Sequence, residues 1–143
     1  MARRNKSKKS KGSAGNNRKA GEEFLLRNSE KESVNETESG LQYTVIENTD
    51  GRKPFPEDEV TIHQRALLLD GKLLEDTYRK NEPDKVELSE LIEGLQEGLQ
   101  LMGEGSRYRF WVPPELGWGK KGTGNKIPPN AVLMFDIRLL EVE

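Results

Sequence analysis

The sequence contains no cysteine and only one histidine, His63. Without cysteine the chain can form no disulfide and has no thiolate to act as a nucleophile or metal ligand, although this absence does not fix the cellular compartment. A single histidine without cysteine supplies too few ligands for a transition-metal site. The sequence therefore points away from disulfide-stabilised, cysteine-dependent and metal-dependent functions.

Long apolar runs are also missing. The chain begins with MARRNK, and its first apolar run is residues 24–26 (FLL), so the start lacks the hydrophobic region of a secretion signal. No run approaches the roughly 20 apolar residues of a membrane-spanning helix. From these absences we expect a cytoplasmic protein that makes no membrane contact.

Acidic residues are missing from the first twenty positions, which hold eight basic residues. The remaining 123 residues hold 15 basic and 25 acidic residues, a net charge of −10, so the overall charge of −2 combines a basic tail with an acidic body. Residues 1–20 contain almost no apolar side chain, which predicts a disordered basic tail. Residues 21–38 are predicted to be a short helix, from Glu22 to about Lys31, and a linker.

The basic tail has three interpretations. It can keep an acidic protein soluble, it can be an arm for an anionic surface such as RNA, the ribosome or acidic lipid, or it can contact the acidic body of its own chain. No aromatic residue lies among its basic residues to stack on bases, so the sequence gives no support to sequence-specific RNA recognition.

The centre of the chain holds one amphipathic helix pattern, predicted over residues 89–102. Its apolar residues recur every three or four positions, as on one face of a helix; they are Leu91, Ile92, Leu95, Leu99 and Met102. Ser89 is suited to the N-cap and Gly103 to the end of the helix. Gly94 and Gly98 each cost about 1 kcal/mol relative to alanine, so we expect tertiary packing to hold this helix.

Strand patterns flank this helix on both sides. Apolar and polar residues alternate near residues 41–45, 60–68 and 107–112, Asp50-Gly51 and Asp70-Gly71 supply turns, and residues 131–142 form a last strand expected at the centre of the sheet. The fold class is therefore α+β, with an antiparallel sheet of about five strands wrapped around one short helix and a domain spanning residues 39–143.

Residues 117–122 (GWGKKG) match the G-x-G-x-x-G pattern of nucleotide-binding loops. That pattern works only when a helix follows, because the helix N-terminus binds the phosphate. Here Pro128 and Pro129 follow closely and forbid an early helix. The glycines are better explained as a flexible loop over a pocket.

Several motifs resemble one known family. Residues 112–119 (VPPELGWG) and 127–140 (IPPNAVLMFDIRLL), together with residues 91–94 (LIEG) and 102–105 (MGEG), resemble the FKBP-type peptidyl-prolyl cis-trans isomerases over about residues 39–143. Residues 38–46 resemble the lead-in of the bacterial macrophage-infectivity-potentiator subgroup. Those relatives carry a long helical dimerisation segment ahead of the domain, and we expect no room for one here and a monomer.

The resemblance implies a strongly bent FKBP-like sheet around the helix, with a site between the helix start and the last loop. The implied reaction is rotation about an X-Pro amide in X-Pro-containing peptides or unfolded protein clients, with no cofactor. It places Glu75, Ile92, Trp118 and Phe135 as catalytic residues. It also implies a set of substrate-binding residues, which are Gln64, Leu74, Asp84, Leu91, Leu95 and Ile127.

The same comparison shows where the chain departs from the family pattern. Gln64 replaces a tyrosine, Leu74 replaces a phenylalanine, Glu75 replaces an aspartate and Asp84 falls where many members have an aromatic wall. The helix floor carries Leu95 in place of the usual tryptophan, and Trp118 takes the place of a loop tyrosine. The resemblance therefore implies catalysis below the family's usual level and weakened affinity for macrolide ligands.

Three functional hypotheses follow. The first is an FKBP-type isomerase that assists protein folding by desolvating and orienting the amide. The second is a non-catalytic peptide-binding or chaperone module on the same fold. The third is a factor that the basic tail places near RNA or the ribosome.

Overall fold

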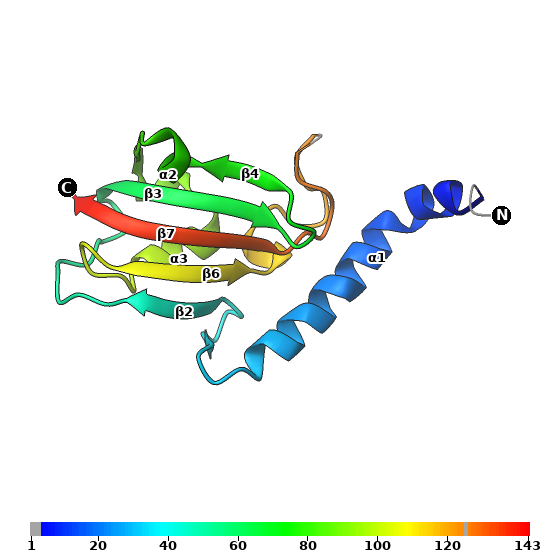
Figure 1. Cartoon of the computed structure of the whole chain (residues 1–143), viewed down its shortest axis with the longest axis horizontal. Coiled ribbons are helices and arrows are strands. Elements are labelled where there is room, and N and C mark those ends of the chain that lie inside the picture. The colour runs from blue at the N-terminus through cyan, green and yellow to red at the C-terminus, as the bar shows by residue number, and fades with distance from the viewer. Residues whose placement is uncertain (1–3, 125) are drawn as a thin grey trace.

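The computed structural model describes the backbone of residues 4–124 and 126–143 and the side chains of residues 17–124 and 126–143. Within these residues twelve elements follow one another, and Figure 1 shows how the helices and the longer strands are arranged. They are α1 (Arg4–Ser29), β1 (Asn35–Glu36), β2 (Gln42–Glu47), β3 (Glu59–Leu68), β4 (Leu73–Asp76), α2 (Thr77–Lys80), β5 (Asp84–Glu87), the 3₁₀ turn η1 (Leu88–Glu90), α3 (Glu93–Leu99), β6 (Arg107–Val112), the 3₁₀ turn η2 (Pro114–Leu116) and β7 (Leu133–Val142).

One antiparallel sheet forms the body of the domain, in the order β1-β2-β6-β7-β3-β4, with β5 also paired to β3. The expected α+β architecture and the central position of the last strand are confirmed, because β7 lies between β6 and β3 (Figure 1). The sheet has seven strands rather than about five. The difference arises because β1 has only two residues, and because the long strand β3 pairs separately with β4 and β5.

The core lies between the inner face of the sheet and α3. Along β7 the residues alternate, with Leu133, Phe135, Ile137 and Leu139 buried and Asp136 between them partly exposed. Successive strand residues point to opposite faces of a sheet, so this alternation gives β7 one apolar face and one polar face. Figure 1 looks onto the polar outer face, with α3 behind the sheet.

The central helix is shorter than the sequence predicts. Ser89 lies inside the 3₁₀ turn η1 and is not an N-cap, and α3 begins at Glu93 with Ile92 as its N-cap. Leu91 and Ile92 have extended backbones, which separate the 3₁₀ turn from the helix. Leu88 is fully buried, so packing of the 3₁₀ turn against the core outweighs the local preference of Ser89 for a helix start.

Two glycines allow α3 to lie directly on β6. A Cβ atom at Gly98 would lie 2.6 Å from Cε1 of Phe110, and one at Gly94 would lie 2.6 Å from Cγ1 of Val112. Real Cβ atoms do not approach other heavy atoms so closely. The glycines therefore lower helix propensity but permit a contact that no larger residue could make.

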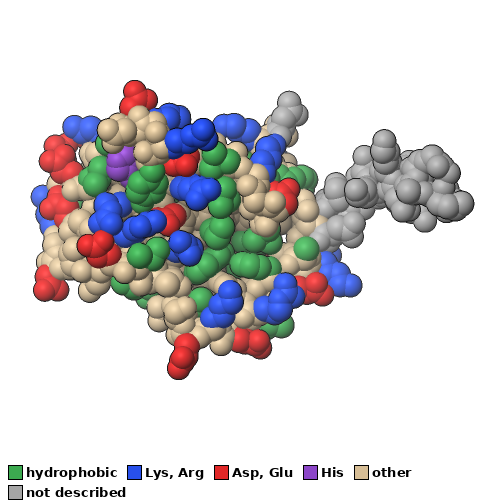
Figure 2. Space-filling view, in the orientation of Figure 1, with side chains coloured by type: hydrophobic (Ala, Val, Ile, Leu, Met, Phe, Trp, Pro, Cys, Tyr) green, Lys and Arg blue, Asp and Glu red, His purple; other side chains and the backbone are tan. Residues whose placement is uncertain are grey.

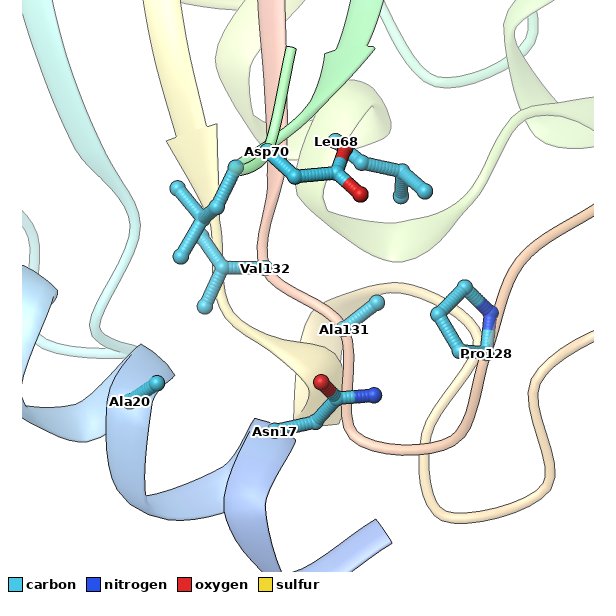
Figure 3. A pocket seen from close by; sticks show the side chains of 8 residues that line it. Asn17, Ala20, Leu68, Asp70, Pro128, Ala131 and Val132 are labelled. Carbon is cyan, nitrogen blue, oxygen red and sulfur yellow. The ribbon is translucent and has the colours of Figure 1, made fainter. Parts of the chain in front are cut away.

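Helix α1 precedes the domain and packs against its end. The side chain of Asn28 donates to Oε1 of Gln42 at 2.9 Å, and Nε2 of Gln42 donates to the carbonyl of Leu25 at 2.9 Å. Near its other described end, Asn17 donates to the carbonyl of Pro129 at 3.2 Å. Figure 3 shows the groove of about 330 Å³ left where α1 passes the tip of the β3–β4 hairpin and residues 128–132.

The prediction for the N-terminal segment is met only in part. The helix expected from Glu22 is present but begins earlier, because the backbone of residues 4–20, which the sequence assigned to the tail, belongs to α1. Asn17 in this stretch also contacts the domain. The side chains of residues 1–16 of the predicted disordered tail lie outside the described part of the structure. No helix in the described part of the chain is both long and apolar enough to cross a membrane.

We predict that Gly98→Ala destabilises the protein, although alanine favours helix formation by about 1 kcal/mol. The added methyl group must displace the buried ring of Phe110, and such overpacking costs about 1–3 kcal/mol. Urea unfolding measures the change. The matched control is Glu93→Ala at an exposed position of α3, expected within about 0.5 kcal/mol of the original protein. Equal stability of the two variants would contradict the tight contact.

Candidate functional site

A cavity of about 460 Å³ opens between the start of α3, strands β3 and β4, and the loop after β6. Nine of the ten residues predicted for the site line it, so the sequence motifs converge on one place. The lining residues are Gln64, Ala66, Leu74, Glu75, Glu90, Leu91, Ile92, Leu95, Trp118, Thr123, Lys126, Ile127, Leu133 and Phe135. Asp84 is the predicted residue that does not line the cavity.

The floor of the cavity is apolar. Phe135 and Leu133 reach it from β7, Leu95 from α3, and Ile127 from the last loop, and all four side chains are buried. Ala66 on β3 stands directly opposite Phe135 in the register of the sheet. A floor of this kind excludes water from part of any ligand that enters.

The site residues predicted in the sequence analysis do not include five of the lining residues: Ala66, Glu90, Thr123, Lys126 and Leu133. Strand parity could have identified two of them. Ala66 is two residues from Gln64 on β3, and Leu133 is two residues from Phe135 on β7, so each shares a face with a predicted residue. No comparable sequence signal marks Thr123 or Lys126.

Ile92 offers a backbone donor at the edge of the cavity. Its carbonyl accepts hydrogen bonds from the N–H groups of Leu95 and Gln96, both at 3.0 Å, which fixes the backbone at the start of α3. Within the described residues its own N–H group has no acceptor. A ligand carbonyl entering the cavity can accept this hydrogen bond.

Trp118 stands on the glycine-rich loop at the cavity mouth, with 45% of its surface exposed. The loop is shaped by hydrogen bonds from Gly119 N–H to the carbonyl of Pro114 and from Asn130 N–H to the carbonyl of Gly119, both at 2.9 Å. Gly122 has a φ of +65°, and a side chain there would collide with the carbonyl of Ile127. The G-x-G-x-x-G match therefore reflects turn geometry, and the loop lies over a pocket as the sequence analysis expected.

A hydrogen-bonded polar pair lies beside one wall of the cavity. Nε2 of Gln64 donates to Oδ2 of Asp84 at 2.9 Å, so the carboxylate lies behind Gln64 and not on the cavity surface. The expectation that Asp84 contacts substrate directly therefore finds no support in the geometry. Asp84 instead holds the side chain of Gln64.

Glu75 lies at the rim and forms an ion pair with Lys80, with 3.0 Å between Oε1 and Nζ. The hydrogen bond from Lys80, together with that from the N–H of Asp76, holds the pKa of Glu75 below its usual value. Glu75 is therefore ionised at neutral pH and poorly suited to take up a proton. Its position favours an electrostatic role at the rim.

The described residues contain no group of three or more side chains of the kinds that bind metal ions. The chemistry available in the cavity is that of apolar surface, one backbone donor, one indole N–H and a few rim charges. Such a site can bind a peptide and alter the environment of an amide.

Comparison with known proteins agrees with this geometry. Residues 50–140 match the family model described as FKBP-type peptidyl-prolyl cis-trans isomerase. The chain belongs to this family. The FKBP model covers the strands and loop that form the cavity, from before β3 to within β7.

Two relatives and one solved structure show how close the similarity is. The chain is 44% identical over 127 residues to the FKBP-type peptidyl-prolyl cis-trans isomerase FkpA of Aeromonas hydrophila, covering 89% of this chain and 47% of that protein. It is 36% identical to the outer membrane protein MIP of Legionella longbeachae, covering 89% of this chain and 54% of that protein. The crystal structure of FkpA from Escherichia coli superposes with a TM-score of 0.89 at 34% identity, covering 96% of this chain and 64% of that one.

The chain therefore spans about half the length of these FKBP relatives. Residues 1–45 match a second family model, the domain amino terminal to FKBP-type peptidyl-prolyl isomerase. The sequence analysis expected no room for such a segment, whereas this match assigns α1 and the residues up to β2 to it. The resemblance to the macrophage-infectivity-potentiator subgroup is confirmed.

We predict that Trp118 and Phe135 differ in their contribution to stability. Phe135 is 7% exposed and belongs to the core, so Phe135→Ala should lower the free energy of unfolding by about 3–5 kcal/mol. Trp118→Ala at the exposed loop should change it by less than about 1 kcal/mol. Thermal and urea unfolding of both variants test this. Equal losses would show that Trp118 is a core residue and not a surface contact.

Proposed function

We propose that this chain is a peptidyl-prolyl cis-trans isomerase acting on X-Pro bonds of peptides and unfolded proteins. The observation that carries the proposal is the cavity, in which a buried apolar floor lies beside the N–H of Ile92, which has no acceptor among the described residues. The names of its relatives support the same activity, since the FkpA proteins of Aeromonas hydrophila and Escherichia coli are both named FKBP-type peptidyl-prolyl cis-trans isomerases.

The mechanism needs no nucleophile, because no covalent bond is broken. Rotation about a peptide bond has a barrier of about 18–20 kcal/mol, which arises from amide resonance. A twisted amide has lost this resonance and is less dipolar than the planar form, so a water-poor cavity favours it. In this cavity Phe135, Leu95 and Ile127 supply the apolar floor on which the proline ring rests.

Two donors orient the substrate. The N–H of Ile92 binds a substrate carbonyl and fixes one side of the rotating bond. The indole N–H of Trp118, which also lines the cavity, donates to the other side. Leu74 and Leu91 close the walls, and Glu75 contributes charge at the rim.

The polar pair Gln64–Asp84 supports a lower catalytic efficiency than an aromatic wall would give. Where family members have aromatic rings, this wall offers an amide held by a carboxylate, which keeps more water near the substrate. Weakened macrolide affinity is proposed for the same reason.

Three further expectations remain predictions. They are a cytoplasmic location, a monomeric state, and a contact between residues 1–20 and RNA or the ribosome. One relative is named an outer membrane protein, which gives no support to the first of these. Because residues 17–20 belong to α1, the tail contact is best examined by removing residues 2–16 and leaving the packed part of the helix intact.

We predict that the chain accelerates isomerisation of X-Pro peptides in a protease-coupled assay. Trp118→Ala should lower kcat/KM about tenfold, which corresponds to a loss of roughly 1.4 kcal/mol of transition-state stabilisation. Phe135→Leu should also reduce kcat/KM while keeping the core filled. Trp118→Phe retains a ring but not the N–H, so an intermediate value would separate packing from hydrogen bonding.

Phe55→Ala is the matched control, because Phe55 is 62% exposed and does not line the cavity. Its activity should equal that of the original chain. If the folded chain gives no acceleration, the isomerase proposal fails and the binding-module hypothesis takes its place.

We also predict a modest preference for lysine over glutamate before proline. Three negative charges lie at or near the cavity: Glu75 and Glu90 line it, and Asp84 lies behind its wall. Two positive charges balance part of them, Lys126 in the lining and Lys80 in its ion pair with Glu75. This excess of one negative charge should favour the lysine substrate about two- to fivefold in kcat/KM at low salt, as expected for exposed charges.

The preference for lysine should fall at high salt. The ratio of kcat/KM for the lysine substrate to that for the glutamate substrate should also decrease in Glu90→Gln. It should not change in the neighbouring control Glu93→Gln, since Glu93 does not line the cavity. A preference for glutamate would contradict this assignment of charge.

A further inference from the structure

The outer face of the sheet carries a second, chemically different depression. A cavity of about 430 Å³ lies between α2 and the central strands, on the side of the sheet opposite to α3. Its lining is almost entirely charged and comprises Arg65, Asp76, Tyr78, Arg79, Arg107, Arg109 and Asp136. Figure 2 shows this face, where Lys and Arg side chains gather over the strands beside a group of apolar side chains.

Strand parity separates this depression from the isomerase cavity. Gln64 and Ala66 line the inner cavity, whereas Arg65 between them lines the outer one. On β7, Phe135 faces inward and Asp136 outward in the same way. The two sites therefore share strands but no side chain, so each can be altered without the other.

Asp136 holds two arginines in place. Nε and an Nη atom of Arg107 bind its two carboxylate oxygens at 2.8 and 2.9 Å, and Arg109 binds it at 3.3 Å. Burial by itself raises the pKa of Asp136, but the hydrogen bonds and charges of Arg107 and Arg109 outweigh it and hold this pKa below the usual value. The carboxylate is thus ionised at neutral pH, and one negative charge orients two guanidinium groups.

Tyr78 completes the wall of the depression. Its ring stacks on His63 with centroids 5.0 Å apart, and its hydroxyl donates to Oδ1 of Asp136 at 3.3 Å. Cζ of Arg107 lies 5.7 Å from the ring centroid, within range of a cation–π contact. Burial together with the charge of Asp136 raises the pKa of Tyr78 to about 12, so the hydroxyl stays a neutral donor.

Positive charge remains in excess. The lining holds four arginines against two carboxylates, an excess of two positive charges on a body whose net charge beyond residue 20 is −10. Arg65 makes only a loose pair with Asp76, at 3.7 Å, and Arg79 has no ion-pair partner among the described residues. Arg65 and Arg79 are therefore available to a ligand, and Asp136 holds Arg107 and Arg109 in fixed orientations. Guanidinium groups presented in this way are suited to binding carboxylates.

An apolar strip continues the face along the same strands. Leu67 is two residues from Arg65 on β3, and Met134 is two residues from Asp136 on β7, so both lie on the outer face with the arginines. Leu67 is paired with Met134 on one side and with Leu73 of β4 on the other. Leu73 is 43% exposed. A ligand that lies across this face therefore meets arginines and then aliphatic side chains.

We propose that this outer face binds an acidic peptide segment in which carboxylates alternate with apolar side chains. The carboxylates contact Arg65, Arg79 and Arg109, while the apolar side chains rest on the strip formed by Leu67, Leu73 and Met134. A peptide fits better than a nucleic acid, because a long polyanion would extend over the surrounding acidic body and be repelled. The proposal does not depend on isomerase activity, since the inner cavity contributes no residue.

The test uses the full chain and a short, labelled, proline-free peptide of alternating Glu and Leu, with binding followed by fluorescence anisotropy. A peptide of alternating Lys and Leu and a labelled single-stranded RNA serve as comparison ligands. The Glu–Leu peptide should bind with an affinity that falls with salt, and Arg79→Glu with Arg109→Glu should weaken it at least tenfold. Arg79→Glu alone, at an exposed position, should give a smaller loss with little effect on the fold.

Lys31→Glu with Lys53→Glu is the matched control, since it makes the same charge change at exposed positions outside the depression. It should leave peptide affinity within twofold and, like the arginine variants, leave isomerisation unchanged. Equal losses in both double variants would assign binding to overall charge and overturn the proposal. No binding of the Glu–Leu peptide, or tighter binding of RNA with the same dependence on Arg79 and Arg109, would also overturn it.

Discussion

The contact between α3 and β6 sets the geometry of the whole domain. Gly94 and Gly98 bring the helix backbone against Val112 and Phe110 at a distance that leaves no space for a Cβ atom. Because the helix lies so close to the strands, the sheet curves around it and the core needs only one layer of side chains from each. The cavity opens beside this contact, at the N-terminal end of the helix, so the packing that stabilises the fold also helps to determine where a ligand can enter.

The same arrangement explains how one sheet carries two kinds of surface. Its central strands alternate between residues that face α3 and residues that face solvent. Phe135 and Asp136 are neighbours in the chain, yet one forms an apolar floor and the other binds two arginines. A substitution on one face therefore affects the side chains of the other face only if it moves the backbone of the shared strands. For this reason the two proposed activities can be separated by mutation.

The sequence was most informative where a pattern is local and strongly constrained. The apolar last segment predicted a strand at the centre of the sheet, and the resemblance to the FKBP family predicted nine of the residues that line the cavity. It was less informative where packing decides between local options. Ser89 has the chemistry of an N-cap, but burial of Leu88 moves the helix start to Glu93, and Asp84 turns from the cavity because Gln64 offers it a hydrogen bond. The arginine cluster could not be predicted, because its members are distant in sequence and meet only through the register of the strands.

The joint between α1 and the domain has a mechanical consequence. Asn28 and Gln42 are buried side chains whose amide groups form a chain of hydrogen bonds ending at the carbonyl of Leu25, and Oδ1 of Asn28 has no partner in the described structure. Hydrogen bonds fix direction more strictly than apolar contacts do, so this joint sets the angle at which the helix leaves the sheet. Asn17, eleven residues earlier in α1, is held to the carbonyl of Pro129 in the loop that carries Ile127. Because α1 is tied at both points, a rearrangement of the amide groups at Asn28 would strain this second contact, which makes α1 a brace between the start of β2 and the cavity loop.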